Sequence, residues 1–350
     1  MSTQNYLDIS DYPQNEKYYG GQSCLKLGVT INGIDYLAKL PGNLKAKNLK
    51  NVILSYSNAP ACEYIGSHIY ASLGIVTHAT TLATYKGKNV VLCKDFLHYG
   101  DVLYEFHQIK ATYPDGFMSL DDGILDSNGS DLDEALMVIR NHVAFKKLPD
   151  FEDHFWKMFI VDAIIGNGDR NNGNFGIVRD KEGSYIAPVY DNGNCLNPTW
   201  DDVKMERALL AKDNSEIYAG KTCFFTRDDK KVNPFQIISS GEFDKCTESL
   251  EFVLKYLDLT EVDDIIDSVA YLSEVQNSWY KYIISARVSY LRSIDPHRGK
   301  EMHKYASEHN MDYKDLLGRI YGGIPTLSKH FDDKELCAME YWETWKGLQL

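Results

Sequence analysis

The chain has 350 residues, of which 44% are hydrophobic and 25% charged, and its formal net charge is −13. This length and composition are typical of a globular protein with one large domain or two lobes. Proteins that bind nucleic acids through phosphate contacts usually carry a basic face, so we expect no direct nucleic-acid partner. No segment approaches the run of about 18 apolar residues that a membrane span needs, so we also expect no membrane partner.

Seven cysteines are scattered along the chain and form no CxxC pair. This spacing argues against a zinc ribbon or a disulfide scaffold and favours a reducing compartment. Residues 1–19 are polar and acidic, without the basic and apolar regions of a signal peptide. We therefore expect a cytoplasmic protein, although unconventional secretion would leave no trace in the sequence.

Residues 18–97 have the pattern of a small β-rich unit. One hairpin is predicted around Asn32-Gly33 and a second around residues 86–88. The segment between the hairpins has apolar residues at helical spacing: Ala61, Ile65, Ile69 and Leu73. The predicted order is strand, strand, helix, strand, strand.

The rest of the chain is mostly helical in pattern. Asp150 is the expected N-cap of a helix that ends near residue 165, and Asp153 completes a weak capping box. Its apolar face is expected to contain Phe155, Phe159 and Ala163. Further helical periods follow at residues 249–257, 261–272, 277–294 and 303–320. A small β-rich lobe before a larger helical lobe is one of several ways to build a cleft.

Residues 166–178, GNGDRNNGNFGIV, hold one aspartate and four asparagines within eight positions. A plain turn is one interpretation, since Asn and Gly adopt positive φ at low cost. A calcium loop that begins at Asp169 fails, because its fifth position is Gly173 and its twelfth is Asp180. Asp169 and Asn174 instead have the D-x4-N spacing of kinase catalytic loops, where the Asp orients the attacking hydroxyl and the Asn holds Mg²⁺.

A second carboxylate, Asp191, follows an apolar β-like run 17 residues after Asn174. Mg²⁺ prefers oxygen ligands, so Asn174 and Asp191 are the expected metal ligands, with ATP phosphates completing the shell. This spacing makes the kinase interpretation better than a plain turn.

The β-rich unit supplies the other parts that a kinase needs, in the expected order. Gly20 and Gly21 allow the backbone to approach phosphate closely, Lys39 lies on a predicted strand, and Glu63 lies on the following helix as a partner for Lys39. Taken singly, Lys39 is better explained as a solvated strand lysine and Glu63 as a solvated helix residue. The order of all these residues along the chain favours a kinase.

Several segments together resemble the HipA-like serine/threonine protein kinases, and above all their compact CtkA-like branch. They are GGQSCLK (20–26), YLAKLP (36–41), NAPACEYIGSHIYASLGI (58–75), VVLCKDFL (90–97), IIGNGDRNNGNF (164–175), APVYDNG (187–193) and KTCFFTRDDKKVNPFQII (221–238). The resemblance covers most of residues 18–240. The GDRNNGN segment is also similar to the D-R-x-x-x-N loop of phosphoinositide lipid kinases.

This resemblance implies an α+β, two-lobed protein-kinase-like fold. Residues 1–17 would be an N-terminal extension, residues 18–97 the N-lobe with its hinge at 93–96, and residues 98–350 the helical C-lobe. Asp169 would be the catalytic residue, and Asn174 and Asp191 would bind Mg²⁺. The residues implied in ATP binding are Gly20, Gly21, Gln22, Ser23, Lys26, Lys39, Glu63, Lys94, Asp95, Phe96, Asn171, Asn174, Tyr190 and Asp191.

The chain also departs from the HipA pattern. HipA has an N-terminal subdomain that is part of how it meets its antitoxin, whereas about 17 residues precede the loop here, so antitoxin binding is not carried over. The position of HipA's autophosphorylated serine corresponds to Lys17, which has no hydroxyl, and Ser23 is the alternative acceptor. The loop is also two residues longer than the family's usual G-x-Q-x-K.

We therefore predict an ATP- and Mg²⁺-dependent serine/threonine protein kinase, related to toxin–antitoxin kinases and capable of autophosphorylation. Its partners would be a protein with a Ser or Thr acceptor and, as an open option, a regulatory or antitoxin-like protein. The alternatives are a nucleotide-binding toxin-like or scaffold protein that acts through a partner, and a small-molecule or lipid kinase.

Overall fold

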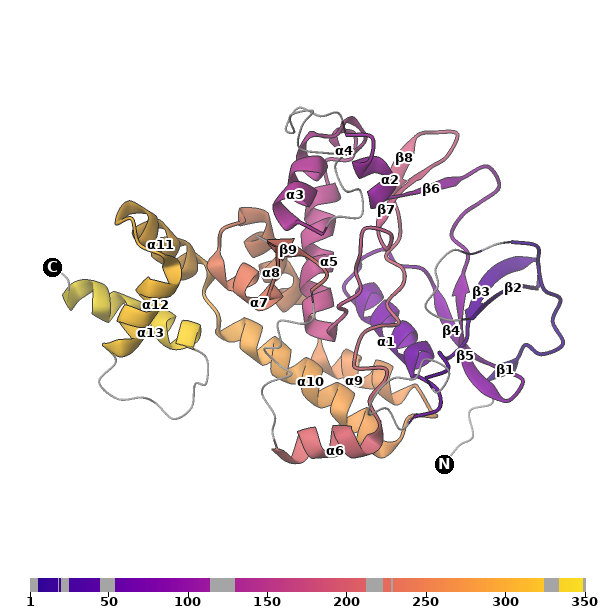
Figure 1. Cartoon of the computed structure of the whole chain (residues 1–350). Helices are drawn as coiled ribbons and strands as arrows, with labels where there is room; N and C mark the ends of the chain where they lie inside the picture. Colours follow the sequence, from indigo (N-terminus) through magenta and orange to yellow (C-terminus); the bar gives the residue numbers. More distant parts are fainter. Residues whose placement is uncertain are drawn as a thin grey trace.

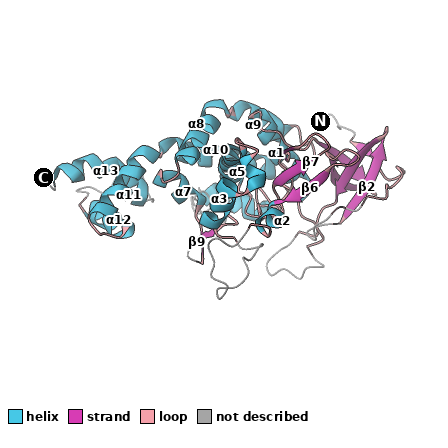
Figure 2. Cartoon of the chain, turned by 90° about the horizontal axis from the view of Figure 1, so that it is seen from above, coloured by secondary structure: helices cyan, strands magenta, loops and turns pink. Residues whose placement is uncertain are grey.

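The computed structural model describes residues 6–17, 19, 25–44, 54–113, 130–211, 223–227, 229–323 and 334–348. A β-rich part and a larger helical part lie side by side, and a group of helices at the C-terminal end lies farthest from the strands (Figure 1, Figure 2). The fold is thus α+β with a small β-rich lobe and a larger helical lobe, as the sequence predicts.

The β-rich lobe contains a five-stranded sheet in the order β1-β4-β5-β3-β2, with one helix packed on it. Its elements are β1 (Leu7–Asp8), β2 (Lys26–Ile31), β3 (Ile34–Lys39), α1 (Ala59–Ser72), β4 (Thr80–Tyr85) and β5 (Lys88–Lys94). Both hairpins turn where the sequence predicts, at Asn32-Gly33 and Lys86-Gly87, and all four residues have positive φ. Two-residue turns of this kind match the twist of the flanking strands. The short β1, which pairs in parallel with β4, was not predicted.

Two apolar layers enclose this sheet. The buried residues Ala61, Ile65, Ile69 and Leu73 of α1 pack between the sheet and the helical lobe, as their spacing predicts. The opposite face has a smaller core of its own, which includes Ile9 next to β1.

The helical lobe begins with a short three-stranded sheet, β6-β7-β8, and a set of helices. These elements are β6 (Val102–Glu105), α2 (Phe106–Lys110), α3 (Leu132–Asn141), α4 (Val143–Lys146), α5 (Phe151–Ile165), β7 (Gly176–Arg179), β8 (Ser184–Ile186) and α6 (Asp202–Ala211). The later elements are β9 (Thr226–Arg227), β10 (Lys230–Lys231), α7 (Pro234–Ser240), α8 (Asp244–Tyr256), α9 (Leu259–Asp267), α10 (Glu274–Ser293), α11 (Pro296–Glu308), α12 (Tyr313–Gly322) and α13 (Lys334–Leu348).

Helix α5 is the centre of this lobe. The predicted apolar face of Phe155, Phe159 and Ala163 is buried, but so are Trp156 and Ile160 on other faces. A helix that is apolar all round belongs inside a core. Burial on every side fixes the direction of α5 and therefore the position of the loop that follows it.

Two details of the predicted helices are wrong. Asp150 is the N-cap of α5, but its side chain makes no capping hydrogen bond, and Asp153 instead forms an ion pair with Lys245 at 2.5 Å. The predicted period at 303–320 is broken into α11 and α12, because Asn310 adopts a positive φ of 49° and Asp312 caps the next helix through the N–H of Lys314.

The last three helices share a small core that is separate from the main one, with Met302, Leu316 and Trp342 buried in it. Across the described ranges, no helix is both long and apolar enough to cross a membrane.

Candidate active site

The asparagine-rich segment is a loop that leaves the buried end of α5. The helix ends at Gly166, whose φ of 69° is left-handed. A Cβ at this glycine would lie 2.5 Å from the guanidinium of Arg287, which itself donates to the carbonyl of Ile164 at the end of α5. The backbone angle therefore favours glycine here, and a larger residue would also displace the guanidinium of Arg287.

The small amides of the loop close its turns from within. The Nδ2 of Asn174 donates to the carbonyl of Asp169 at 2.6 Å, and the N–H of Gly173 donates to Oδ1 of Asn171 at 2.9 Å. The Nδ2 of Asn171 also donates to the carboxylate of Asp169 at 3.2 Å. The loop is therefore a set of tight turns and also a candidate site, because the same asparagine side chains close the turns and line the site.

Arg170 is buried beneath the loop and holds it to its surroundings. Its guanidinium donates twice to the Asp162 carboxylate of α5, at 2.8 and 3.1 Å. It also donates to the carbonyls of Asn174 and Tyr190 and to Oδ1 of Asn192. One side chain therefore ties α5, the loop and the segment around residue 191 together.

Asp191 is brought to this loop from the segment that follows β8. Its backbone has a left-handed φ of 60°, which is uncommon for a residue other than glycine. Such conformations persist only when the surroundings determine them, and they cluster at functional sites. The neighbouring Tyr190 donates its hydroxyl to the carbonyl of Gly173 at 3.0 Å, which joins this segment to the loop.

Lys39 at the end of β3 connects Asp191 with the helix α1. Its Nζ lies 2.7 Å from Oε2 of Glu63 and 2.8 Å from Oδ1 of Asp191. Oε1 of Glu63 accepts from the N–H of Asn192 at 3.0 Å and lies 2.9 Å from Nε2 of His78. The predicted Lys39–Glu63 pair is therefore formed.

These groups surround one cavity of about 380 Å³ between the two lobes. Ligand pockets for small molecules start at about 300 Å³. Of the predicted site residues, the cavity is lined by Lys26, Lys39, Lys94, Asp95, Phe96, Asp169, Asn171, Asn174, Tyr190 and Asp191. Glu63 lines a smaller adjacent cavity of about 160 Å³, to which Lys39, Asp169 and Asp191 also contribute. The predicted loop residues Gly20, Gly21, Gln22 and Ser23 lie outside the described residues.

The pKa values of the Asp169 and Asp191 carboxyl groups are shifted in opposite directions. Burial raises the pKa of Asp169 above its ordinary value. The ammonium of Lys39 lowers the pKa of Asp191 below its ordinary value. Burial by itself lowers the pKa of Lys39, but Glu63 and Asp191 raise it well above its usual range. Lys39 therefore stays a cation.

The segment at 93–96 joins the lobes along one edge of the cavity. Its Asp95 carboxylate accepts from Nζ of Lys17 at 2.8 Å and from the hydroxyl of Tyr19 at 3.2 Å. Lys17 also lies 3.1 Å from Asp35 on β3. The side chain of Asp95 thus fastens the segment ahead of the predicted phosphate loop, and Phe96 packs near Tyr190 with ring centroids 5.9 Å apart.

The chain was compared with known proteins. No model of a known protein family matches it. It is 31% identical over 321 residues to the serine/threonine-protein kinase CtkA of Helicobacter pylori, an alignment that covers 89% of this chain and 94% of that protein. The chain belongs to the CtkA-like family of HipA-like serine/threonine protein kinases.

One solved structure agrees with this family membership, and a second is reported for comparison alone. The crystal structure of the H. pylori proinflammatory kinase CtkA matches this CtkA-like kinase with a TM-score of 0.73 and 28% identity, over 84% of this chain and 98% of that one. A chain of the complex of HipA, HipB and operator DNA from the Shewanella oneidensis toxin–antitoxin system gives a TM-score of 0.46 and 13% identity, over 82% of this chain and 71% of that one. The predicted fold and the predicted serine/threonine kinase activity are confirmed. The alternative predictions, a scaffold, a small-molecule kinase or a lipid kinase, are not confirmed.

The sequence did not identify several residues of this site in the CtkA-like kinase. Arg170 follows Asp169 directly, but nothing in the sequence indicates that it is buried against Asp162 eight residues earlier. Other cavity-lining residues that were missed are Tyr19, Leu37, His78, Leu97, Leu103 and Glu105. They come from separate strands and connections, and their convergence depends on the folded topology.

We expect Arg170→Met to destabilise the protein and to slow phosphoryl transfer. Removal of one partner of a buried ion pair costs about 3–5 kcal/mol, because the charge of Asp162 is left uncompensated. A displaced loop should lower kcat by about 10²-fold, since a shift of about 1 Å has that effect. Chemical denaturation and steady-state kinetics measure the two effects.

Arg140→Met is the matched control for this variant. Arg140 forms an ion pair with Glu152 at 2.6 Å, but its side chain is 45% exposed. Exposed pairs contribute about 0–1 kcal/mol, so this change should be almost neutral. Equal unfolding free energies for the two variants would contradict the role given to Arg170.

Proposed function

We propose that this kinase transfers the γ-phosphoryl group of ATP, in the presence of Mg²⁺, to a Ser or Thr hydroxyl of a protein. One observation carries the proposal: a single cavity gathers Lys39 from β3, Asp169 and Asn174 from the loop after α5, and Asp191 from the segment after β8. These residue types, in this order, are the ones that position and neutralise a transferred phosphoryl group in protein kinases.

The oxygens of Asn174 and Asp191 suit a hard divalent cation. The amide nitrogen of Asn174 is engaged with the carbonyl of Asp169, which leaves Oδ1 as the atom that a cation would contact. Oδ1 of Asp191 is bonded to Lys39, and the side chain is 30% exposed, so Oδ2 is the oxygen that remains for a cation. Mg²⁺ bound there would neutralise the charge of the phosphates.

Asp169 is the group that we assign to orient the acceptor hydroxyl. Its carboxylate lines both cavities beside Lys39 and Asp191. Environments that push the pKa values of two neighbouring carboxyls apart indicate different roles for them. The lowered pKa of Asp191 suits a metal ligand, and the raised pKa of Asp169 suits an acceptor of a hydrogen bond from a hydroxyl.

Two lysines supply positive charge for the phosphates. Lys26 and Lys39 are direct partners across β2 and β3, so their side chains emerge on the same face of the sheet. Like charges in that arrangement are destabilising on their own. Lys39 is neutralised by Glu63 and Asp191, and Lys26 also helps to lower the pKa of Asp191. We propose that both ammonium groups face the phosphates of bound ATP.

The hinge at 93–96 would hold adenine through its backbone. The N–H of Lys94 donates to the carbonyl of Ala79 at 2.8 Å and that of Asp95 donates to the carbonyl of Asp35 at 3.0 Å. We therefore assign the N–H of Phe96 to the nucleobase. Asn171 and Tyr190 would lie beside the nucleotide.

The remaining expectations are proposals of the same kind. We propose that the acceptor is a protein and that the kinase also phosphorylates itself, with Ser23 as the candidate. A regulatory or antitoxin-like partner and a location in the cytoplasm stay proposals that rest on the sequence.

The experiment for this function measures phosphate transfer from labelled ATP to the kinase and to dephosphorylated casein, with and without a chelator of divalent cations. We expect acid-stable phosphoserine or phosphothreonine that disappears with the chelator and returns with added Mg²⁺. If neither protein is labelled although a thermal melt shows that ATP binds, the result would contradict the proposal that the kinase phosphorylates proteins in general. Label that is independent of divalent cations would contradict the roles of Asn174 and Asp191.

A further inference from the structure

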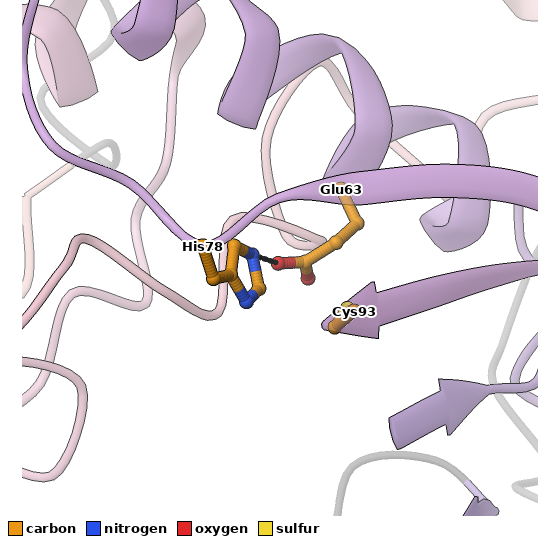
Figure 3. A group of neighbouring side chains, drawn as sticks. All are labelled: Glu63, His78 and Cys93. Atoms are coloured by element: carbon orange, nitrogen blue, oxygen red, sulfur yellow. Dashed lines mark ion pairs between the residues drawn. The ribbon is translucent and has the colours of Figure 1, made fainter. Parts of the chain in front are cut away.

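Three side chains with metal-binding atoms lie close together beside Lys39. Glu63 pairs with Lys39, and the backbone of Cys93 begins the proposed hinge, but the Cys93 thiol and His78 have no role in the proposed transfer reaction. Glu63 comes from α1, His78 from the connection before β4, and Cys93 from β5, and Figure 3 shows them gathered around one point. Their ligand atoms all lie within 4.8 Å of one another, and all three residues are buried. Nε2 of His78 and Oε1 of Glu63 lie 2.9 Å apart.

This donor set is selective for a borderline-soft cation. Carboxylate oxygen, imidazole nitrogen and thiolate sulfur are all ligands of Zn²⁺, whereas Mg²⁺ and Ca²⁺ take oxygen ligands almost alone. Zinc sites with three protein ligands keep a fourth position for water. At Zn²⁺ bond lengths of about 2.0–2.3 Å, tetrahedral ligand atoms lie about 3.3–3.8 Å apart. The His78–Glu63 distance of 2.9 Å would therefore have to open slightly, and a separation near the 4.8 Å limit would have to close by about 1 Å.

The nucleotide cavity gives a cation access to the cluster. His78 and Cys93 both line that cavity, next to Lys39. The hydroxyl of Ser67 lies 3.1 Å from Nε2 of His78 and accepts a hydrogen bond from Nδ2 of Asn192 at 3.0 Å. Because Nε2 also faces Oε1 of Glu63, a cation bound at this nitrogen would displace the Ser67 hydroxyl from it.

A cation in this cluster would compete with Lys39. The ammonium of Lys39 lies 2.7 Å from Oε2 of Glu63, so the lysine and a divalent cation would share one carboxylate. Two positive charges on one buried carboxylate repel each other strongly. The lysine would have to leave Glu63, and the nucleotide would lose the positioned cation that faces its phosphates.

We propose that Glu63, His78 and Cys93 form an inhibitory Zn²⁺ site at the rear of the nucleotide cavity. Zinc binds the Glu63 carboxylate, the His78 imidazole and the Cys93 thiolate, and the thiol proton passes to solvent. Zinc and ATP then weaken each other's binding by the same factor, because binding linkage is reciprocal. The binding statement stands independently of the proposed function, whereas the inhibition rests on the role proposed there for Lys39.

The binding test titrates the metal-free wild-type protein with Zn²⁺ in the presence of excess Mg²⁺, and a chromophoric zinc chelator serves as the competitor. A second titration with Co²⁺ detects the charge-transfer absorption of a metal-bound thiolate. We expect one tight site and a thiolate band. Cys93→Ser should abolish the band, and both Cys93→Ser and His78→Gln should weaken zinc binding at least about tenfold, the loss that even outer-shell changes cause.

Cys246→Ser is the control for thiol content, because Cys246 is buried in α8, away from the cavity. It should keep the thiolate band and the affinity of wild type. Thermal melts confirm that each variant is folded. Zinc binding by Cys93→Ser as tight as that of wild type, or no tight site in wild type, would overturn the proposal.

The inhibition test compares each protein with its own zinc-free activity. Zinc should raise the apparent KM for ATP in wild type, and the concentration for half inhibition should rise about tenfold in His78→Gln, in line with the affinity loss. If zinc binds but does not change the apparent KM for ATP, the inhibitory role is wrong and the proposed metal site is retained. An enzyme inactive without zinc would contradict the proposed function, while the binding titration still decides the site.

Discussion

Asp169→Asn is expected to reduce phosphoryl transfer by about 10²- to 10⁴-fold, the usual contribution of a positioned acid–base group. The affinity for ATP with Mg²⁺ should be almost unchanged, because Asp169 is assigned to the acceptor hydroxyl and not to the nucleotide or the metal. Asparagine keeps the size of the side chain and the partner Asn171. Single-turnover kinetics and nucleotide titration followed by thermal melts separate the two quantities.

Asp191→Asn is the comparison that makes this result specific. Asp191 is assigned to the cation and holds Lys39 at 2.8 Å, so its replacement should weaken Mg²⁺-dependent ATP binding as well as transfer. Charge stabilisation by a bound metal contributes several kcal/mol, which is a factor of about 10³ or more in rate. If Asp169→Asn lost nucleotide affinity and Asp191→Asn kept it, the two roles would have to be exchanged.

The sequence could predict those parts of the site that are local or ordered along the chain. Asp169 and Asn174 are recognisable because a five-residue separation lies within one loop. Lys39 and Glu63 are recognisable because they follow the glycines in the order that a kinase requires. The turns at Asn32-Gly33 and Lys86-Gly87 carry their own backbone signal, since glycine accepts positive φ.

Burial and long-range convergence could not be predicted in the same way. Arg170 looks like an ordinary charged loop residue, yet it is 3% exposed and bonded to Asp162. His78 and Cys93 are 15 residues apart in the sequence and meet only because β4 and β5 pair beside α1. The break between α11 and α12 depends on the backbone conformation of Asn310. The helical spacing of apolar residues in the sequence continues across this position and does not indicate the break.

Lys39→Met is expected to lower both activity and stability. Removal of a single preorganised charge that faces the reacting groups costs about 10²- to 10³-fold in kcat. The Glu63 carboxylate, 1% exposed, would lose its ion pair and keep only His78 and the N–H of Asn192. Breaking a buried pair costs about 3–5 kcal/mol, and we expect the lower end because these partners remain. Denaturant unfolding and initial rates measure the two losses.

The acid side of the stability profile tests the same pair. Although burial raises the pKa of Glu63, Lys39 and His78 lower it well below its ordinary value of 4.5. A carboxyl whose folded pKa is lowered adds stability above its unfolded pKa and loses it as the pH falls. Wild type should therefore lose stability below about pH 4.5 through this group, and Lys39→Met should lose less.

The double variant Lys39→Met/Glu63→Gln separates the structural and catalytic parts of the loss. Replacing both members of a buried ion pair by neutral groups is often close to neutral for stability, so the double variant should regain most of what Lys39→Met loses. Activity should not return, because no cation then faces the phosphates. Recovery of activity together with stability would mean that Lys39 acts only by supporting Glu63 and the fold. Recovery of neither would mean that the buried pair fixes the position of α1 in a way that an amide cannot replace.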